Sequence, residues 1–252
     1  MSTVPMPVPV PESKPVAAIS PWGRVFGVLF SPGQTFADIA RVPSFVLPLI
    51  LTTVLSLIAV TTLNMHMNWS QYVRQKIDES PRGSSLSAEQ KDQQAETGAK
   101  ITTYIVYASG LLAPIIFSLI VAVVMLGAFN LLGGAKATFM QSLAIAAHSG
   151  LVGLISTPIF VLVMFLKPKG TIDPENPVVT NVAAFLPEDS AKWLIALGKS
   201  IDVFTIWTLI LVAIGFAAVN PKKLKGGTAY GIVFGVYGAY VVCRVIWAFA
   251  FS

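Results

Sequence analysis

The run YIVYASGLLAPIIFSLIVAVVMLGAFNLL, residues 104–132, contains no charged side chain. A helix of about 20 residues, at 1.5 Å per residue, already crosses the ~30 Å hydrocarbon core of a bilayer. Four further apolar runs of spanning length occur in the chain, at 44–63, 139–166, 202–219 and 229–250. The sequence therefore predicts an all-α fold, a polytopic membrane helix bundle with five transmembrane helices in a domain that covers 44–252.

The composition of the 252-residue chain agrees with this fold class. Hydrophobic residues make up 54% of the chain and charged residues 12%, whereas a soluble domain carries about 25% charged residues. So few charges cannot cover a water-exposed surface, which excludes an ordinary soluble enzyme, and the chain is too apolar to be disordered. The net charge of +5 does not indicate a nucleic-acid partner, because the basic residues form no stripe. We expect the lipid bilayer to surround the protein.

Two segments precede the first span. Residues 1–21 are rich in proline, which is typical of a solvated, disordered, polyproline-like tail, and they lack the apolar core of a signal peptide. Residues 22–43 are too short to span the membrane. Trp22, Phe26 and Phe30 recur there at helical spacing, which predicts short interfacial amphipathic helices. The alternative is that these helices pack on the surface of the bundle.

Two four-residue motifs predict helix starts outside the spans. In SPGQ, residues 31–34, a serine N-cap precedes a proline at the first helical position and a glutamine that can close a capping box. SAEQ, residues 87–90, has the same serine and glutamine of a capping box, and it predicts a helix that continues into the span at 104–132. The polar segment 69–100 should therefore form a helical hairpin outside the bilayer.

Basic residues in short connections predict the orientation of a membrane protein. Lys222, Lys223 and Lys225 crowd the connection between the last two spans, and Lys136 lies in the other short connection. The basic residues on the opposite side are spread over two long segments. We therefore predict an N-terminus inside and a C-terminus outside.

Ionisable groups within spans are costly and are the first candidates for function. His148 lies near the middle of its span among small residues, either as a proton relay or ligand contact or as a structural histidine. Asp202 and Arg244 are equally far from the middle of the turn at 220–228, so antiparallel helices place them at one depth, where they can pair. Alternatively, Asp202 stabilises the start of its own helix and Arg244 snorkels outward.

Small residues recur every fourth position along the last span, which lets helix backbones approach closely. They are Gly227, Gly231, Gly235 and Ala239, and we expect them to pack within the bundle rather than in a dimer. No nucleotide, metalloprotease or paired-cysteine motif occurs in the sequence, and Cys243 is its one cysteine. We predict no catalytic residues, no cofactor-binding residues and no metal site, and hence a protein that is not an enzyme.

Two further motifs carry a family resemblance. SPGQTF at 31–36 is followed by Pro43 and a span, and DVFTIW at 202–207 opens the fourth span, with Gly215 further along. In this order and spacing, the chain resembles the bacterial form of the Yip1-domain family over about 22–249. The resemblance implies an integral membrane protein, in bacteria one of the cytoplasmic membrane. Eukaryotic relatives associate with prenylated Rab GTPases and with each other in vesicle traffic. This chain lacks their Asp-Leu-Tyr-Gly-Pro-type segment, so Rab binding is not carried over.

Two functions follow as hypotheses. The first is a non-catalytic integral membrane protein that organises lipid or membrane partners, including other copies of itself. The second is a small transporter, channel or lipid scramblase, which His148 and the prolines at 48, 114 and 158 favour because prolines in spans mark kinks. A polar cavity that reaches His148 would favour transport, whereas a dry and tightly packed midplane would favour the first hypothesis.

Overall fold

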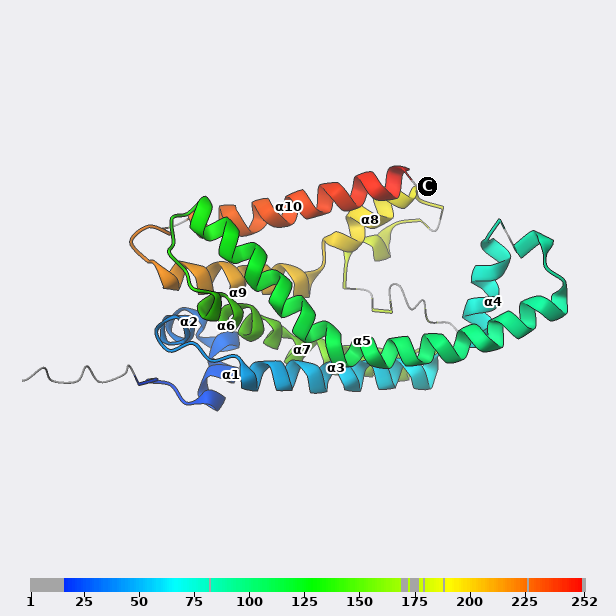
Figure 1. Cartoon of the computed structure of the whole chain (residues 1–252), viewed down its shortest axis with the longest axis horizontal. Coiled ribbons are helices and arrows are strands. Elements are labelled where there is room, and N and C mark those ends of the chain that lie inside the picture. The colour runs from blue at the N-terminus through cyan, green and yellow to red at the C-terminus, as the bar shows by residue number, and fades with distance from the viewer. Residues whose placement is uncertain are drawn as a thin grey trace, which may run out of the picture.

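A computed structural model describes residues 16–81, 83–168, 172, 177–178, 180–187, 189–225 and 227–250, so the tail predicted at 1–21 lies mostly outside the described residues. Within the described part the chain is helical, with no strand beyond an isolated bridge. The predicted all-α membrane helix bundle is confirmed (Figure 1). The helices are α1 (Pro21–Phe30), α2 (Pro32–Arg41), α3 (Val46–His66), α4 (Trp69–Glu79), α5 (Ala88–Leu131), α6 (Phe139–Ser149), α7 (Gly153–Leu166), α8 (Lys192–Ser200), α9 (Val203–Val219) and α10 (Gly227–Ala250).

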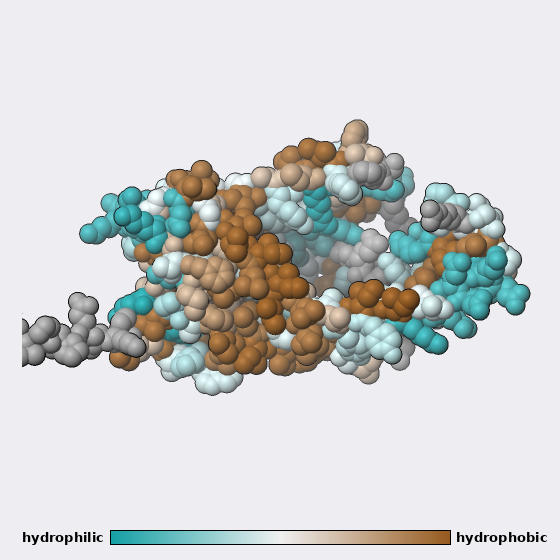
Figure 2. Space-filling view, in the orientation of Figure 1, coloured by the Kyte–Doolittle hydropathy of each residue, from teal (hydrophilic) through white to brown (hydrophobic). Residues whose placement is uncertain are grey.

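Four segments of the described chain are long and apolar enough to cross a membrane: α3, α5, the continuous pair α6–α7, and α10. The fourth predicted span, α9, is helical but has only 17 residues. It is about 25 Å long, at the lower end of the ~17–25 residues that a span needs. Figure 2 shows a broad hydrophobic band over the bundle, with hydrophilic atoms gathered at the two ends of the molecule. This distribution is the one expected for a surface in contact with lipid.

Helix α5 has 44 residues, so it continues far beyond its apolar part. It begins at the predicted capping box, in which Ser87 Oγ accepts from the backbone of Gln90 and the Gln90 side chain accepts from the backbone of Ser87. Helix α4 lies against its polar beginning, and Lys91 bridges to Asp78 across the pair. The predicted helical hairpin is thus present, and it projects from one end of the bundle as a hydrophilic arm (Figures 1 and 2).

The prolines in spans have different effects from one another. Helix α5 bends part-way along (Figure 1), and Pro114 in its interior removes one backbone hydrogen bond. Pro48 lies in the first turn of α3, where the backbone N–H has no partner within the helix, so this proline does not kink the helix. The third span is interrupted by a 3₁₀ turn at Gly150–Val152 rather than at Pro158, which lies inside α7.

Helix α2 begins at Pro32 as predicted, but the capping box at its start is not formed. Ser31 makes no side-chain cap hydrogen bond, because it also ends α1: its backbone N–H donates to Gly27 O at 2.7 Å. Its backbone is therefore not in the extended conformation that aims a capping hydroxyl at the helix (φ −143°, ψ 55°).

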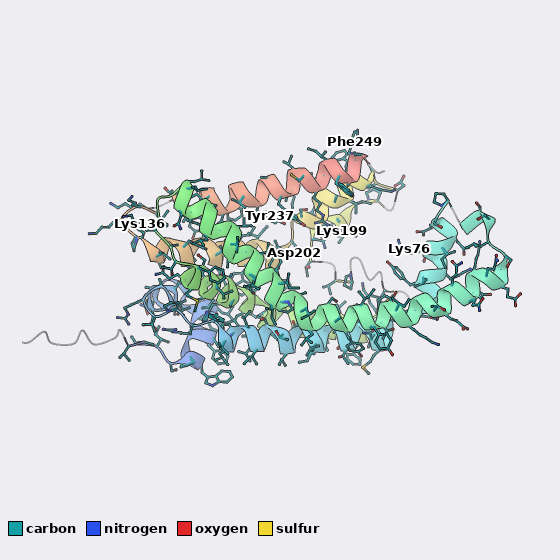
Figure 3. The ribbon with its side chains drawn as sticks, viewed as in Figure 1. Lys76, Lys136, Lys199, Asp202, Tyr237 and Phe249 are labelled. Carbon is teal, nitrogen blue, oxygen red and sulfur yellow. The ribbon has the colours of Figure 1, made fainter. Side chains whose placement is uncertain are left out.

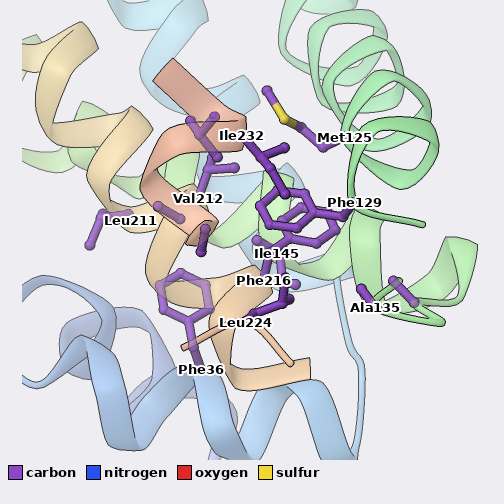
Figure 4. Packing of buried hydrophobic residues seen from close by; sticks show 14 of the residues in the cluster. Phe36, Met125, Phe129, Ala135, Ile145, Leu211, Val212, Phe216, Leu224 and Ile232 are labelled. Atoms are coloured by element: carbon purple, nitrogen blue, oxygen red, sulfur yellow. The ribbon is translucent and has the colours of Figure 1, made fainter. Parts of the chain in front are cut away.

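The core of the bundle fixes α2 against α9 and α6. Phe36 of α2 is fully buried in a cluster with Ile145 of α6 and with Phe129 and Phe216, whose rings stack at 4.2 Å (Figure 4). A stacked pair contributes about 0.5–1.5 kcal/mol beyond its buried area. Gly215 makes the close approach possible, because a Cβ at this position would lie 2.5 Å from Ile145 and 3.0 Å from Phe36.

The N-terminal helices have one face packed on the bundle and another face exposed. Val25 and Val28 of α1 are buried against the bundle, whereas Trp22, Phe26 and Phe30 are exposed along its outer face. The connections α5–α6 and α9–α10 lie at the same end of the molecule as α1 and α2, and the C-terminus lies toward the opposite end (Figure 1). The outer row of aromatic residues is therefore available to a membrane interface at that end, and interfacial insertion stays a prediction.

Candidate functional site

His148 is buried in the bundle, with 1% of its surface exposed. Its Nδ1 lies 2.8 Å from Ala144 O, and since a carbonyl only accepts, Nδ1 carries the proton. The hydroxyl of the neighbouring Ser149 is fully buried and has no hydrogen-bond partner in the described chain. His66 at the end of α3 is buried with the same bond to the carbonyl four residues back. This shared geometry is that of a satisfied structural histidine, and a relay through His148 stays a prediction.

A buried ion pair that sequence reasoning missed lies in the N-terminal helices. Arg24 of α1 and Asp38 of α2 are 2% and 5% exposed. Arg24 donates to Asp38 Oδ2 through Nε at 3.0 Å and Nη2 at 2.8 Å, and its Nη1 donates to Val42 O and Ser44 Oγ. This guanidinium therefore ties together α1, α2 and the chain that enters α3.

The carboxylate of Asp38 is equally well satisfied. It accepts from the backbone of Ala18 and Ile19 and from Arg41, in addition to Arg24. Burial raises the pKa of Asp38, but these hydrogen bonds outweigh it and hold the pKa well below its ordinary value of 3.8. The group is thus charged at neutral pH and holds α1, α2 and the chain before α1 together. The signal in the sequence was an arginine within an otherwise apolar helix.

Asp202 acts as the N-cap of α9. Its Oδ1 accepts from the backbone of Thr205 at 2.8 Å, and its Oδ2 accepts from Thr180 Oγ1 at 2.5 Å. Two backbone hydrogen bonds, from Val182 to Ile201 O and from Val203 to Thr180 O, join the same two segments. The carboxylate therefore holds the long connection before α8 against the start of α9, in agreement with its interpretation as a helix-start residue.

Arg244 of α10 reaches the same end of the bundle but contacts a different group. Its Nη1 donates to Ser200 Oγ at 3.1 Å, and Tyr237 donates to Ser200 O at 2.7 Å. Figure 3 shows Asp202 and Tyr237 on neighbouring elements there. No ion pair within 4.0 Å joins Asp202 to Arg244 among the ion pairs of the described residues. Asp202 and Arg244 therefore bind different partners near Ser200, and their pairing stays a prediction.

The small-residue stripe of α10 lies on its outer face. Gly227, Gly231, Gly235 and Ala239 are exposed, and a Cβ added at any of the three glycines would meet no atom within 4 Å. The helix packs on α8 and α9 through its other face, where Ala229, Ile232 and Val233 are buried. The expectation that the stripe packs within the bundle is therefore wrong, because spacing along a helix does not determine which face turns inward.

A cleft lies at the base of the polar hairpin, between the start of α4 and residues 96–103 in the first half of α5. It has a volume of about 550 Å³ and is lined by Met67, Asn68, Trp69, Ser70, Glu96, Ala99, Lys100 and Thr103. A smaller cleft of about 70 Å³ adjoins it. Both clefts lie at the hairpin, and neither is lined by His148. Within the described part of the chain, no group of three His, Cys, Asp or Glu side chains is placed to hold a metal ion.

Comparison with known families agrees with this architecture. The Yip1 domain family model matches residues 26–246, which is most of the chain and extends into the last span. The chain belongs to the Yip1 domain family. The matched region begins within α1 and ends within α10; it includes α2 with Asp38, whereas Arg24 lies two residues before it.

A bacterial relative supports a bacterial-type member of the Yip1 family. The chain is 25% identical over 228 residues to "Membrane protein YknW" of Bacillus subtilis (strain 168), an alignment that covers 86% of this chain and 87% of the relative. No solved structure matches the chain. The chain is therefore an integral membrane protein of Yip1 type, similar to a bacterial membrane protein along nearly its whole length.

Proposed function

We propose that this Yip1-family protein is not an enzyme but organises lipid or membrane partners through its outer surfaces. The packing around His148 carries the proposal. Ala144, Ala147, Leu151 and Val152, which lie within four residues of His148, are each at most 2% exposed. This close apolar packing supports the proposal over a polar passage. A transporter or channel needs polar groups along a continuous path. The two clefts at the hairpin lie outside the centre of the bundle.

The outer surfaces offer more to a partner than the interior does. The small-residue face of α10 is unoccupied, and the exposed apolar rows of α3 and α5 face outward. Each surface can contact lipid, another membrane protein or a second copy of this chain. We further propose a bacterial cytoplasmic-membrane location with the N-terminus inside, which the lysines of the 133–138 and 220–228 connections support.

Reconstitution tests this function against transport. Purified protein in proteoliposomes should give ion flux and lipid scrambling no faster than empty vesicles. In cells, a photo-crosslinking residue at the exposed positions of Tyr104 or Phe234 should form discrete crosslinked species, and the same residue at the buried Phe216 should form none. Flux or scrambling that is lost in His148→Ala would overturn the proposal in favour of transport.

A further inference from the structure

The cleft at the base of the hairpin lies where the chain passes from apolar to polar surroundings. Its wall at Met67–Trp69 directly follows the span α3, and its wall at Thr103 directly precedes the apolar part of α5. Figure 2 shows the hydrophobic band giving way to the hydrophilic arm in this region. A group bound in the cleft would therefore lie at the level of lipid headgroups.

Two opposite charges line this cleft. Glu96 and Lys100 are one helical turn apart on α5, so their side chains leave the same face. Both are exposed, and neither forms an ion pair among the ion pairs of the described residues. The cleft thus presents one cation and one anion whose Cα atoms are about 6 Å apart along the helix, both available to a ligand.

We propose that the cleft binds the headgroup of a phospholipid that carries a phosphate and a primary ammonium, as in phosphatidylethanolamine. Lys100 would donate to the phosphate, and Glu96 would accept from the ammonium. The two-carbon link holds the phosphate and the ammonium on one headgroup, so one ligand can contact both side chains. This inference rests on the proposed function, in which the outer surfaces engage lipid, and it names the lipid headgroup that one surface would bind.

The lining also argues against other headgroups. Phosphatidylglycerol has no cation for Glu96, so its net negative charge is repelled there. A quaternary ammonium such as choline cannot donate a hydrogen bond and is usually held by aromatic faces. Trp69, the aromatic residue of the cleft lining, is buried, donates to Asn64 Oδ1 at 2.6 Å and forms a T-shaped contact with Tyr72, so it does not form an open aromatic cage.

The neighbouring surface favours a lipid over a free phosphoester. Tyr104 is exposed on α5, one helical turn beyond Lys100, and Met65 is exposed at the end of α3, two residues before the cleft wall at Met67. These side chains continue the cleft into the apolar band, where acyl chains would lie. A soluble headgroup would make the polar contacts alone and lose the apolar ones.

Native mass spectrometry of the full-length protein in detergent tests the site with three defined lipids. Dioleoyl phosphatidylethanolamine should bind about tenfold more tightly than the matching phosphatidylcholine, a difference of ~1.4 kcal/mol. Glu96→Gln should abolish this preference without weakening phosphatidylglycerol binding, and Lys100→Gln should weaken all three lipids. Glu89→Gln and Lys192→Gln, exposed positions outside the cleft, are the matched controls and should change nothing.

Three outcomes would overturn the site: equal binding of the ethanolamine and choline lipids by the unmodified protein, control variants that act like Glu96→Gln, or competition by soluble glycerophosphoethanolamine at the lipid's own concentration. The last outcome would identify a free phosphoester as the ligand. Each leaves the flux result of the proteoliposome test unchanged, so failure of the site and failure of the proposed function are separate observations.

Discussion

Replacing Asp38 by asparagine removes the anion from the most completely buried ion pair of the described chain. Arg24 then keeps its positive charge with 2% of its surface exposed, and the asparagine NH₂ faces N–H donors that the carboxylate had satisfied. Breaking a buried pair on one side costs about 3–5 kcal/mol. For a chain of this size we expect a fall in Tm of roughly 6–20 °C, at about 2–4 °C per kcal/mol.

Thermal unfolding in detergent, followed by fluorescence-detected size exclusion, measures this effect. Arg41→Gln is the matched control: its side chain, 54% exposed, pairs with the same carboxylate. An exposed partner contributes about 0–1 kcal/mol, so its Tm should fall by no more than a few degrees. The double variant Arg24→Met, Asp38→Leu should lose less than the sum of its single variants, because no buried charge is left alone. Equal losses for Asp38→Asn and Arg41→Gln would refute the reasoning.

The pH dependence of the same pair has a defined sign. Asp38 holds its proton less tightly when folded than when unfolded, because its pKa lies below the ordinary value of 3.8. Its stabilising contribution is therefore complete above about pH 3.8 and is lost as the pH falls below it. The Tm difference between the unmodified protein and Asp38→Asn should shrink on acidification through that range. A difference that grew with acid would contradict the assignment.

Three further outcomes can be checked. Gly198→Ala should lower the Tm, because the new Cβ would lie 2.8 Å from the backbone of Ala183, whereas Gly231→Ala meets open space and should raise helix stability by about 0.5–1 kcal/mol. Tyr237→Phe loses the hydrogen bond to Ser200 O and should lower the free energy of unfolding by about 0.5–1.5 kcal/mol. An unchanged Tm in the same detergent assay would contradict a stabilising role for that bond. Reporter fusions should place the N-terminus inside and the C-terminus outside, and external labelling of the lysine-rich connection in intact cells would refute this orientation.

The sequence predicted elements better than it predicted contacts. Apolar length identified the four segments of spanning length and the shorter helix α9, and the capping box at 87–90 identified the beginning of α5 to the residue. The same type of motif at Ser31 identified the helix start but not the capping hydrogen bonds, which do not form because that residue ends one helix as it begins the next. A local pattern predicts a local structure only where no neighbouring element competes for the same backbone groups.

Side-chain partners depend on rotation about helix axes, which no spacing along the chain determines. The glycines of α10 have the period that favours close packing, yet they lie on the outer face, while Gly215 alone makes the tight contact between α9, α2 and α6. Arg24 and Asp38 are 14 positions apart in two short helices, and only the turn at Ser31 brings them together. In a bundle surrounded by lipid, apolar residues face both inward and outward, so hydrophobicity cannot distinguish the two directions. The buried polar contacts distinguish inward from outward faces, because a paired charge has to face its partner.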